Sequence, residues 1–530
     1  KYFFREVCRG QFIDQLLQCS NELLRERQKI CASMSNIDYE FIDDYENEMA
    51  DIASSLAIDN GKKIIDRTRI HVDTDSLKRW ASKELIEDYT RYHDLLDVNV
   101  KASFENEFNE IFSDILNKGG GSTKWKSLNK DSEADMVFIS LLARLSDEFL
   151  NSPEYGLDFY LSKRVRHQSF IGLIRGPLEF GNLITTKEST GVYNTNEHVL
   201  SKLGHLSEES LYIIDSEFKK FSKKFDDLLE NTKNSYLQIN GSDNPKGLIT
   251  FEIQEQIIFL LKMMTHKVSN FSDFIDVAVS VFWTSLSIPL SNVRMYISEN
   301  LQKSVAILFD DLILNLKKSV KSTDKEFYCL ILEIKDCSIE VQRELGIAAQ
   351  WFSRSNTEDI AQSTFDANQL LDIAIDSTLK CHQSFHPDIT KKVKNDADML
   401  LDTSTLVFVH DAMFVALGNI YRHSGVENPR VSVTTEITDN TYSIRVVSDI
   451  TQKNIQQKID KLDEIRNLIC ERKFERRTRK EGGSGLLKIA AVALQDPLGN
   501  IDFYIEDDTF ILNVTYRVLM AAVPVERVHG

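Results

Sequence analysis

A glycine-rich segment near the C-terminus holds residue types that could bind an anion. Gly482, Gly483, Ser484 and Gly485 precede Leu486, which opens an apolar stretch with helical spacing. Glycines ahead of a helix let backbone N–H groups face a phosphate, and the helix N-terminus adds positive potential. The segment therefore predicts a phosphate site, with a flexible linker as the alternative.

A second polar group lies upstream, at the end of a helix expected from Val407 to His423. It contains Asn419, Arg422 and His423. An amide oxygen is a hard ligand that suits Mg²⁺, and a guanidinium group can hold phosphate through two parallel hydrogen bonds. These residue types are therefore suited to a phosphate that carries a metal ion.

A carboxylate follows the alternating segment 444–448, whose period of two predicts a β-strand. This is Asp449. A buried hydrogen bond from such a carboxylate to a base would give base selectivity. The alternative is an ordinary turn residue, the commonest setting for a lone Asp after a strand.

The elements that must position these residues alternate between helices and strand pairs. The predicted strands cover 431–435, 442–447, 501–505 and 510–514. The expected helices cover 407–423, 455–474 and 486–494. This order predicts a two-layer α/β domain over residues 364–520, unlike the chain before it.

The order of elements, together with the polar segments, resembles the catalytic ATP-binding domain of sensor histidine kinases, in the GHKL ATPase superfamily. Leu417–Ser424 resembles the N box, the strand that ends at Asp449 resembles the strand before the family's Asp-x-Gly-x-Gly, and 481–489 resembles the G2 box. The resemblance is confined to the C-terminal part of the chain, and it implies that ATP and Mg²⁺ are the cofactors.

The resemblance assigns a role to each matching residue. It implies that Asn419 binds the Mg²⁺ on the nucleotide phosphates, that Arg422 neutralises phosphate charge, and that His423 lies beside the nucleotide. It also implies that Asp449 accepts a hydrogen bond from the adenine amino group. The predicted nucleotide-binding residues are Asn419, Arg422, His423, Asp449, Gly482, Gly483, Ser484, Gly485 and Leu486, with Asn419 as the metal ligand.

The sequence departs from the family pattern at several positions. Val415 stands where hydrolysing members carry a Glu that activates water, and Val cannot accept a proton. Segment 450–453 lacks both glycines of the Asp-x-Gly-x-Gly motif, and Leu487 replaces a later glycine of the G2 box. Catalysis by any particular residue therefore stays open, as does the choice between slow hydrolysis, a pseudokinase and a fold retained without nucleotide binding.

Two basic clusters could bind phosphate or an acidic partner. The run 472–480 lies where the family has a mobile lid over the nucleotide, and a solvated helix face is an equal alternative. For Lys163–His167 the favoured interpretation is an exposed helix start. Shortly afterwards Arg175-Gly-Pro-Leu resembles part of a phosphoacceptor helix, but Gly172 replaces the histidine. Its distance from the ATP-binding domain also argues against that role.

Upstream of the α/β domain the chain predicts helices almost throughout. Residues 1–118 and 123–322 are joined by a Gly-Gly-Gly-Ser linker, and an apolar helical seam follows in the stalk-like segment 323–363. This seam predicts one hairpin of a helical domain, the favoured interpretation, or a dimerising stalk like that of sensor kinases. The segment contains no phosphoacceptor His-Glu-x-x-x-x-Pro sequence. The expected fold class is thus multidomain, a mostly α-helical N-terminal body plus a C-terminal α/β two-layer sandwich of GHKL ATPase type.

Composition restricts the possible partners and compartment. The 530 residues carry a net charge of -18, which disfavours a general nucleic-acid coat because phosphate binding is driven by Lys and Arg. The 7 cysteines are odd in number and scattered, which argues against a disulfide framework or a structural zinc site. No secretory signal is expected, and the most apolar stretch, 277–290, is too short to span a bilayer. We therefore expect a cytoplasmic protein, and the missing initial Met suggests a fragment.

The leading interpretation is an ATP-binding signalling or switch protein whose helical body senses or binds a partner. Large helical bacterial proteins with such domains look similar to stress or phage-defence components. A protein partner or a homodimer would use the helical segments. One alternative is a non-enzymatic pseudo-ATPase scaffold. Another is a nucleic-acid-binding sensor, which would rely on the two basic clusters against the overall negative charge.

Overall fold

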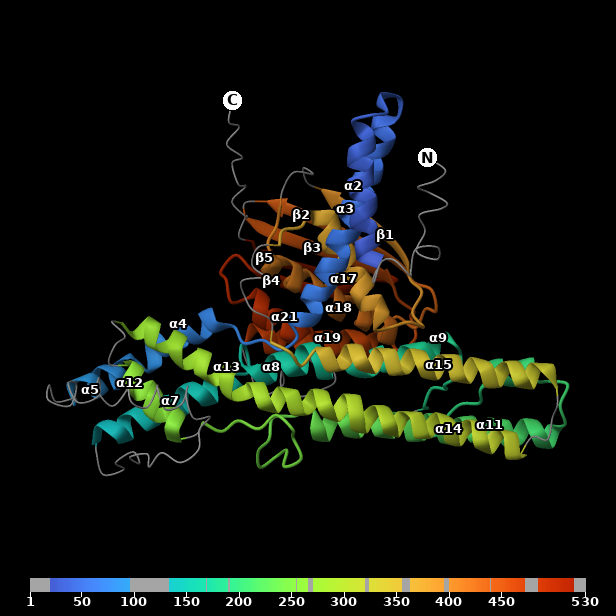
Figure 1. Ribbon diagram of the computed structural model, residues 1–530, viewed down its shortest axis with the longest axis horizontal. Helices are drawn as coiled ribbons and strands as arrows, with labels where there is room; N and C mark the ends of the chain where they lie inside the picture. The colour runs from blue at the N-terminus through green and yellow to red at the C-terminus, as the bar shows by residue number, and fades with distance from the viewer. Residues whose placement is uncertain are drawn as a thin grey trace.

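The computed structural model confirms the predicted fold class of a helical body with a C-terminal α/β domain. In Figure 1 the body lies horizontally and the α/β domain stands against its middle. The described residues are 20–95, 133–167, 169–188, 191–253, 255–265, 270–319, 324–354, 363–394, 400–438, 440–471 and 485–518. The predicted linker at 119–122 and the basic run 472–480 lie outside them. The predicted domain boundaries stay predictions.

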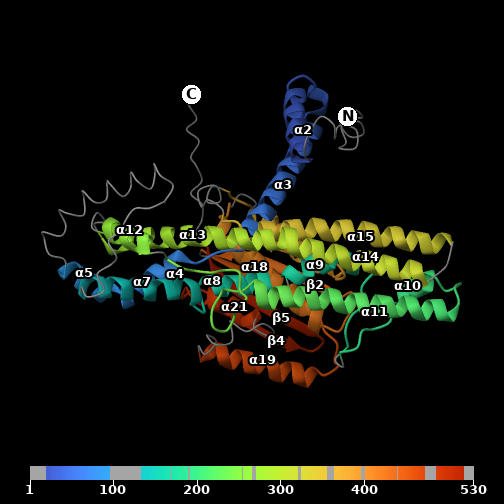
Figure 2. The ribbon, with the colours of Figure 1, turned by 60° about the horizontal axis from the view of Figure 1, so that its bottom comes forward.

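The backbone of the body is a pair of long helices. α13 (Phe271–Met295) continues through the π-helical turn η5 (Tyr296–Leu301) into α14 (Gln302–Ser319). α15 (Lys325–Gln350), which contains the predicted seam, returns beside α14 (Figures 1 and 2). The side-chain amides of Gln302 and Gln342 each donate to the other residue's carbonyl oxygen, at 3.1 and 3.0 Å. These reciprocal bonds fix the register of the hairpin.

Further helices pack along this pair. α11 (Glu208–Asn231) lies against α14, where the ring centroids of Phe221 and Phe309 are 5.1 Å apart. α9 (Ser169–Phe180) packs on α15. The remaining elements of this part are α8 (Leu157–Leu161), η3 (Ser162–Arg166), α10 (Glu197–Lys202) and η4 (Thr232–Tyr236). The seam is therefore buried within a helical assembly.

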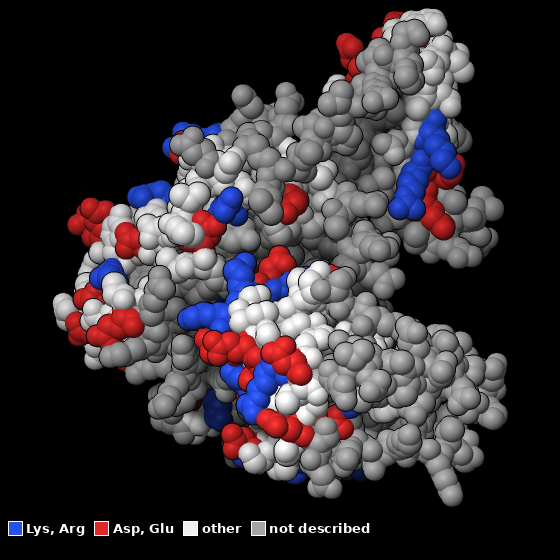
Figure 3. All heavy atoms as spheres, turned by 90° about the vertical axis from the view of Figure 1, so that its left-hand side faces the viewer, with Lys and Arg blue, Asp and Glu red and all other residues white. Residues whose placement is uncertain are grey.

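One end of the body is a smaller cluster of helices around the start of α13. It consists of α4 (Thr74–Glu84), α5 (Ile86–Asp94), α7 (Glu133–Asn151) and α12 (Glu255–Thr265). Inside this cluster Lys262 forms a buried ion pair with Asp135. On the face that carries this end, acidic and basic side chains are interspersed (Figure 3). The described residues of that face form no single-sign basic surface of the kind on which nucleic acids bind.

An N-terminal hairpin of α2 (Ser20–Ser35) and α3 (Ile42–Arg67), with the short η2 (Tyr39–Phe41) between them, projects past the α/β domain (Figure 1). The base of α3 packs on α17 (Ala367–Lys380). Gly61 permits this approach, because a Cβ there would lie 2.3 Å from Cδ1 of Ile373. Helix α3 thus contributes to the core of the C-terminal domain.

The α/β domain contains a five-stranded sheet in the order β1-β2-β3-β5-β4. Its strands are β1 (Asp388–Lys394), β2 (Arg430–Thr438), β3 (Thr441–Asp449), β4 (Asn500–Glu506) and β5 (Thr509–Arg517). β1 runs parallel to β2, and the other pairs are antiparallel. Alternate side chains of β2 and β3 are buried under helices α17, α18 (Thr403–His423) and α21 (Gly485–Ala493). The result is a two-layer sandwich.

Two helices are long and apolar enough to cross a membrane by length and composition, Phe271–Lys318 and Thr403–His423. In the first, half of the most apolar window is buried inside the protein, and in the second the buried share is 89%. The core helix of a folded domain meets the same criteria. Both helices pack against other parts of the chain, as core helices do.

Candidate functional site

The helix that carries the N-box residues is held at both ends. At its start the Asp402 carboxylate accepts a hydrogen bond of 2.9 Å from the backbone N–H of Thr405. After its end Gly425 adopts a φ of +71°, and a Cβ there would lie 2.6 Å from Oγ1 of Thr451. The backbone N–H of Thr451 donates to the carbonyl of Ser424 at 2.8 Å. This close approach brings the end of α18 beside the end of β3.

A pocket lies where α18, β3, α19 (Ile455–Cys470) and α21 meet. Of the nine residues predicted to bind nucleotide, the described ones all line it: Asn419, Arg422, His423, Asp449, Gly485 and Leu486. Gly482, Gly483 and Ser484 lie outside the described residues. The fold therefore gathers the described predicted residues, although 67 positions separate Asn419 from Leu486 in the sequence.

One part of the pocket is apolar, as a base-binding site requires. It is formed by Ile450, Leu462, Ile465, Ile505 and Phe510. Asp449 is the one carboxylate among the described lining residues. Its carboxylate is therefore a candidate hydrogen-bond acceptor for a base bound in this pocket.

Asp449 already has a partner in this structure. Its Oδ2 accepts hydrogen bonds from the backbone N–H and the Nε of Arg430, at 3.1 and 3.0 Å. These bonds hold the pKa of the Asp449 carboxyl below its usual value. The Arg430 side chain is 81% exposed, so water screens the ion pair and little free energy opposes its opening. The contact with Arg430 therefore competes with the predicted base contact.

The pocket lining also carries cationic side chains. Arg422 donates from Nε to the carbonyl of Gly418 at 2.9 Å, and burial lowers the pKa of its guanidinium. Lys458 and Lys461 of α19 also line the pocket, and burial lowers the pKa of Lys458. Sequence analysis did not single out these two lysines. Their spacing of three, on a helix that follows the strand ending at Asp449, was the available signal.

Two neutral polar groups complete the lining. The Ser448 side chain is 2% exposed, and its Oγ has no hydrogen-bond partner. Asn419 is half-buried, and its side chain makes no hydrogen bond to another described residue. A buried hydroxyl without a partner costs free energy that a polar ligand could recover. The residues present thus fit a magnesium-bound nucleotide: an apolar wall, a carboxylate, three cations and two uncommitted polar groups.

Val415 stands at the position where hydrolysing members of the resembled family carry a Glu, and in this structure it has a packing role. A Cβ added to Gly485 would lie 2.9 Å from Cγ1 of Val415. The glycine that begins α21 therefore rests directly on this valine. The pair fixes the N-terminus of α21 at the pocket without providing a proton acceptor.

The structure shows that the expected exposure of Lys163–His167 was wrong. Lys163, Arg164 and Arg166 are all buried, in the π-helical turn η3. Nζ of Lys163 and a terminal nitrogen of Arg164 lie 2.8 and 3.1 Å from Oδ2 of Asp411, on α18. The two cations hold the pKa of the Asp411 carboxyl well below its usual value, although burial opposes this. Local sequence could not reveal the burial because the counter-charge lies 247 positions away.

The turn η3 also reaches the pocket. His167 lines it from the helical body, and Lys488 of α21 donates from Nζ to Oγ of Ser162 at 2.8 Å. Gly172 and Arg175, on α9, were also wrongly expected to lie far from the C-terminal α/β domain. A Cβ on Gly172 would lie 2.2 Å from the carbonyl oxygen of Cys381, at the end of α17. The residues around Arg175 are therefore distant in sequence but adjacent in space to the α/β domain.

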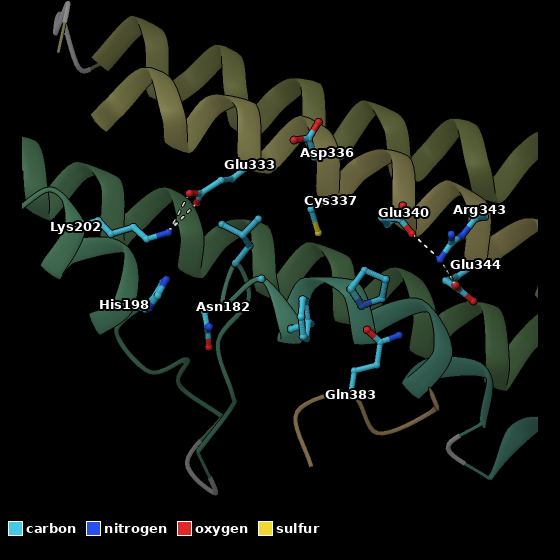
Figure 4. A pocket seen from close by; sticks show the side chains of 14 residues that line it. Asn182, His198, Lys202, Glu333, Asp336, Cys337, Glu340, Arg343, Glu344 and Gln383 are labelled. Carbon is cyan, nitrogen blue, oxygen red and sulfur yellow. Dashed lines mark hydrogen bonds and ion pairs between the residues drawn. The ribbon is translucent and has the colours of Figure 1, made fainter. Parts of the chain in front are cut away.

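A second cavity of about 630 Å³ lies between α9, α10 and α15 (Figure 4). Its charged groups largely pair with one another: Lys202 with Glu333 at 3.0 Å, and Arg343 with Glu340 at 2.7 Å and with Glu344 at 3.2 Å. Burial raises the pKa of the Cys337 thiol to about 12, so that thiol is protonated and unreactive at neutral pH. None of the described site residues predicted from the sequence lines this cavity, and we assign it no chemistry.

Family models match two parts of this chain. A family model named Y4jQ matches residues 79–352, which is more than half of the chain. The chain belongs to the Y4jQ family. A second model, described as "y4jQ C-terminal putative histidine kinase domain", matches residues 366–518 of this Y4jQ-family protein. Its C-terminal part is a divergent histidine-kinase-like domain.

Three curated relatives share most of the Y4jQ-family chain. The protein y4jQ of Sinorhizobium fredii is 25% identical over 539 residues, covering 98% of this chain and 49% of y4jQ. The Detocs histidine-protein kinase DtcA of Vibrio alginolyticus is 21% identical, covering 85% of this chain and 41% of DtcA. DtcA of Enterobacter cloacae is 20% identical, covering 84% and 38% respectively. The chain thus spans half or less of the length of these relatives.

Among solved structures, similar chains include histidine kinases. The catalytic domain of histidine kinase ThkA is 13% identical, with a TM-score of 0.22, and covers 29% of this chain and 95% of that domain. The histidine kinase AdeS of Acinetobacter baumannii is 12% identical, with a TM-score of 0.22, and covers 41% of this chain and 95% of AdeS.

Proposed function

We propose that this protein binds ATP with Mg²⁺ in the pocket between α18, β3, α19 and α21 and is a nucleotide-controlled signalling protein. One observation carries the proposal. Asn419, Arg422 and Asp449, predicted from the sequence, line one pocket whose apolar and cationic side chains suit a base and a polyphosphate. The same pocket includes Gly485, the first residue of α21.

In this proposal each lining residue has a role that follows from its chemistry. The amide oxygen of Asn419 would hold Mg²⁺, a hard cation that prefers oxygen ligands. Arg422, Lys458 and Lys461 would neutralise the phosphates. Asp449, released from Arg430, would accept the hydrogen bond of the adenine amino group. When bound, ATP would supply a phosphoryl group for transfer.

The buried contacts between the pocket helices and the body support control of the body by nucleotide. Asp411 of α18 pairs with Lys163 and Arg164, and Lys488 of α21 binds Ser162. A ligand that moves α18 or α21 would therefore change packing in the body. Coupling of this kind requires that the nucleotide-bound and nucleotide-free states differ in their contacts. These bonds can supply that difference.

We further propose a cytoplasmic role in bacterial stress or phage defence. The likeness to two relatives named Detocs histidine-protein kinases supports a signalling role of this kind. A homodimer through α14 and α15 is the proposed assembly. Apolar side chains that stay exposed on these helices favour it, and they are Ile307, Leu314, Tyr328, Leu332 and Ile339. Light scattering of the chain and of an Ile339→Glu variant would test the dimer, which the variant should weaken.

Calorimetric titration with ATP, ADP and a non-hydrolysable ATP analogue, each with Mg²⁺, tests nucleotide binding. We expect binding that Asn419→Ala abolishes and Lys461→Ala weakens. Asn467→Ala and Lys453→Ala are the matched controls, because both side chains are exposed and neither lines the pocket. Equal binding by Asn419→Ala and Asn467→Ala would contradict the proposed site.

The second candidate function is a scaffold that keeps the fold without nucleotide. The occupied carboxylate of Asp449 and the apolar Val415 favour it. Failure of all three nucleotides to bind the intact chain would select this candidate and exclude the first. A nucleic-acid sensor is less favoured, because the cluster Lys163–Arg166 is buried.

A further inference from the structure

One histidine of the helical body is directed to the nucleotide pocket. His167 follows the turn η3 and is 5% exposed, yet it lines the pocket together with Arg422 and Gly485. Its Nε2 lies 3.7 Å from the point that a Cβ on Gly485 would occupy. The imidazole therefore lies at the N-terminus of α21, which is the end of the pocket suited to phosphate.

The turn that bears His167 is fixed to both helices that form this end. The backbone N–H of His167 donates to the carbonyl of Ser162 at 2.9 Å. Oγ of Ser162 accepts from Lys488 of α21, and Lys163 pairs with Asp411 of α18. These buried contacts set the position of the imidazole relative to the pocket. A reacting group must be held in this way if it is to meet a bound substrate.

The surroundings of His167 suit both an attacking nitrogen and a phosphorylated product. Burial, with the charges of Lys488, Arg422 and Lys233, lowers the pKa of the imidazole to about 3. The ring is therefore neutral at physiological pH and keeps a lone pair on one nitrogen. The same three cations would attract the negative charge of a phosphoryl group added to the ring.

We propose that His167 is the acceptor of the γ-phosphoryl group of ATP bound in this pocket, an inference that rests on the proposed function. The ring nitrogen that faces Gly485 forms a bond to the γ-phosphorus. The bond from that phosphorus to the β–γ bridging oxygen breaks, and its electron pair leaves with ADP. The other ring nitrogen loses its proton to solvent. The products are an N-phosphohistidine, ADP and one proton.

His423 is the natural comparison, because His167 and His423 are the histidines among the described lining residues. His423 is exposed at the C-terminal end of α18 and belongs to the α/β domain itself. It lacks the fixed, buried position of His167. The His423→Gln variant therefore tests whether a histidine that lines the pocket without this fixed position also accepts phosphate.

The test uses the whole chain with ATP and Mg²⁺. Phosphate on the protein is measured by mass spectrometry of the intact chain under alkaline conditions, and its position is mapped by tandem mass spectrometry. We expect one acid-labile phosphate at position 167. It should be absent from His167→Gln and retained in His423→Gln. Thermal unfolding checks that both variants are folded, and direct mapping in the unaltered chain decides the matter if His167→Gln does not fold.

Binding provides a second readout that needs no turnover. A carboxylate at position 167 would lie beside the terminal phosphate of ATP, so His167→Glu should weaken binding of the non-hydrolysable analogue more than binding of ADP. Phosphate mapped to another residue, or ATP binding without phosphate at position 167, would overturn the inference and leave the proposed function standing. If no nucleotide binds, the proposed function fails, and this inference fails with it.

Discussion

Nζ of Lys163 lies 2.8 Å from Oδ2 of Asp411, and both side chains are buried. This ion pair joins the π-helical turn η3 of the body to α18, the helix that also carries Asn419. It is therefore a polar contact between the helical body and a helix that lines the pocket. Removing one partner of a buried ion pair is strongly destabilising, because the other charge stays buried without compensation.

Asp411→Asn should destabilise the protein strongly. The substitution removes the charge that compensates Lys163 and Arg164, and it leaves two buried cations without a carboxylate. We expect a loss of about 3–5 kcal/mol, measured as a lower midpoint in chemical denaturation. Asp496→Asn is the control, since Asp496 pairs with Arg517 at the surface. An equal effect of the two substitutions would refute the structural role of the buried pair.

Buried neutral histidines should make stability depend on pH. Burial lowers the pKa of His167 to about 3 and that of His382 to about 4, from 6.5. The unfolded chain then binds more protons below pH 6.5, so stability is constant above this value and falls as the pH decreases towards about 3. Between pH 7 and pH 5 each histidine should cost roughly 2 kcal/mol.

Thermal unfolding at a series of pH values measures this dependence. His382→Gln should show a shallower loss of Tm below pH 6.5 than the unaltered chain, because it removes one group that titrates on unfolding. His198→Gln is the matched control, since His198 is exposed. An unchanged slope in His382→Gln would mean that this histidine is not held neutral by burial.

Two glycine substitutions should have opposite effects. Gly485→Ala places a Cβ 2.9 Å from Val415, so we expect overpacking of about 1–3 kcal/mol and weaker nucleotide binding. Gly346→Ala, within α15, meets nothing within 4 Å and should stabilise the protein by about 0.5–1 kcal/mol through helix propensity. Denaturation midpoints and calorimetry measure both. A harmless Gly485→Ala would argue against close packing at the start of α21.

Ser448→Ala separates stability from ligand binding. The hydroxyl is buried without a partner, so its removal should leave the stability of the ligand-free protein unchanged or raise it. If the hydroxyl serves a nucleotide, ATP affinity should fall in the same variant. Ser222→Ala is the contrast: its Oγ accepts from the backbone N–H of Thr185 at 3.2 Å, so its loss should cost roughly 1 kcal/mol. Unaltered ATP affinity in Ser448→Ala would remove Ser448 from the site.

The elements that local pattern predicted best are those with strong periodicity. The alternating segments around 431–435 and 442–447 are β2 and β3, and the helix expected at 407–423 begins four residues earlier, at Thr403. β1 was missed because its sequence, Asp388–Lys394, is largely polar and charged. Such a sequence suits an edge strand, whose exposed residues carry no apolar signal.

The site was predictable only in part, and for a physical reason. Short segments whose residue types and order indicate their chemistry contain Asn419, Arg422 and Asp449. The segments around Lys458, Lys461 and Ser448 give no such indication, because a lysine on a helix or a serine in a strand is ordinary without its neighbours. Their membership of the pocket depends on the end of α18 meeting the end of β3, which Gly425 and Thr451 bring about.

By itself the sequence determined the helical body, the α/β domain after it and the residues suited to a nucleotide, since these follow from periodicity, turn chemistry and local motifs. Only the tertiary structure decided that the basic turn Lys163–Arg166 is buried against Asp411 and that His167 enters the pocket. An isolated run of cations favours water, so the sequence pattern indicates exposure. The carboxylate of Asp411 compensates these cations inside the protein and so allows their burial. The sequence alone does not show that Asp411 lies beside them, because it is far away along the chain.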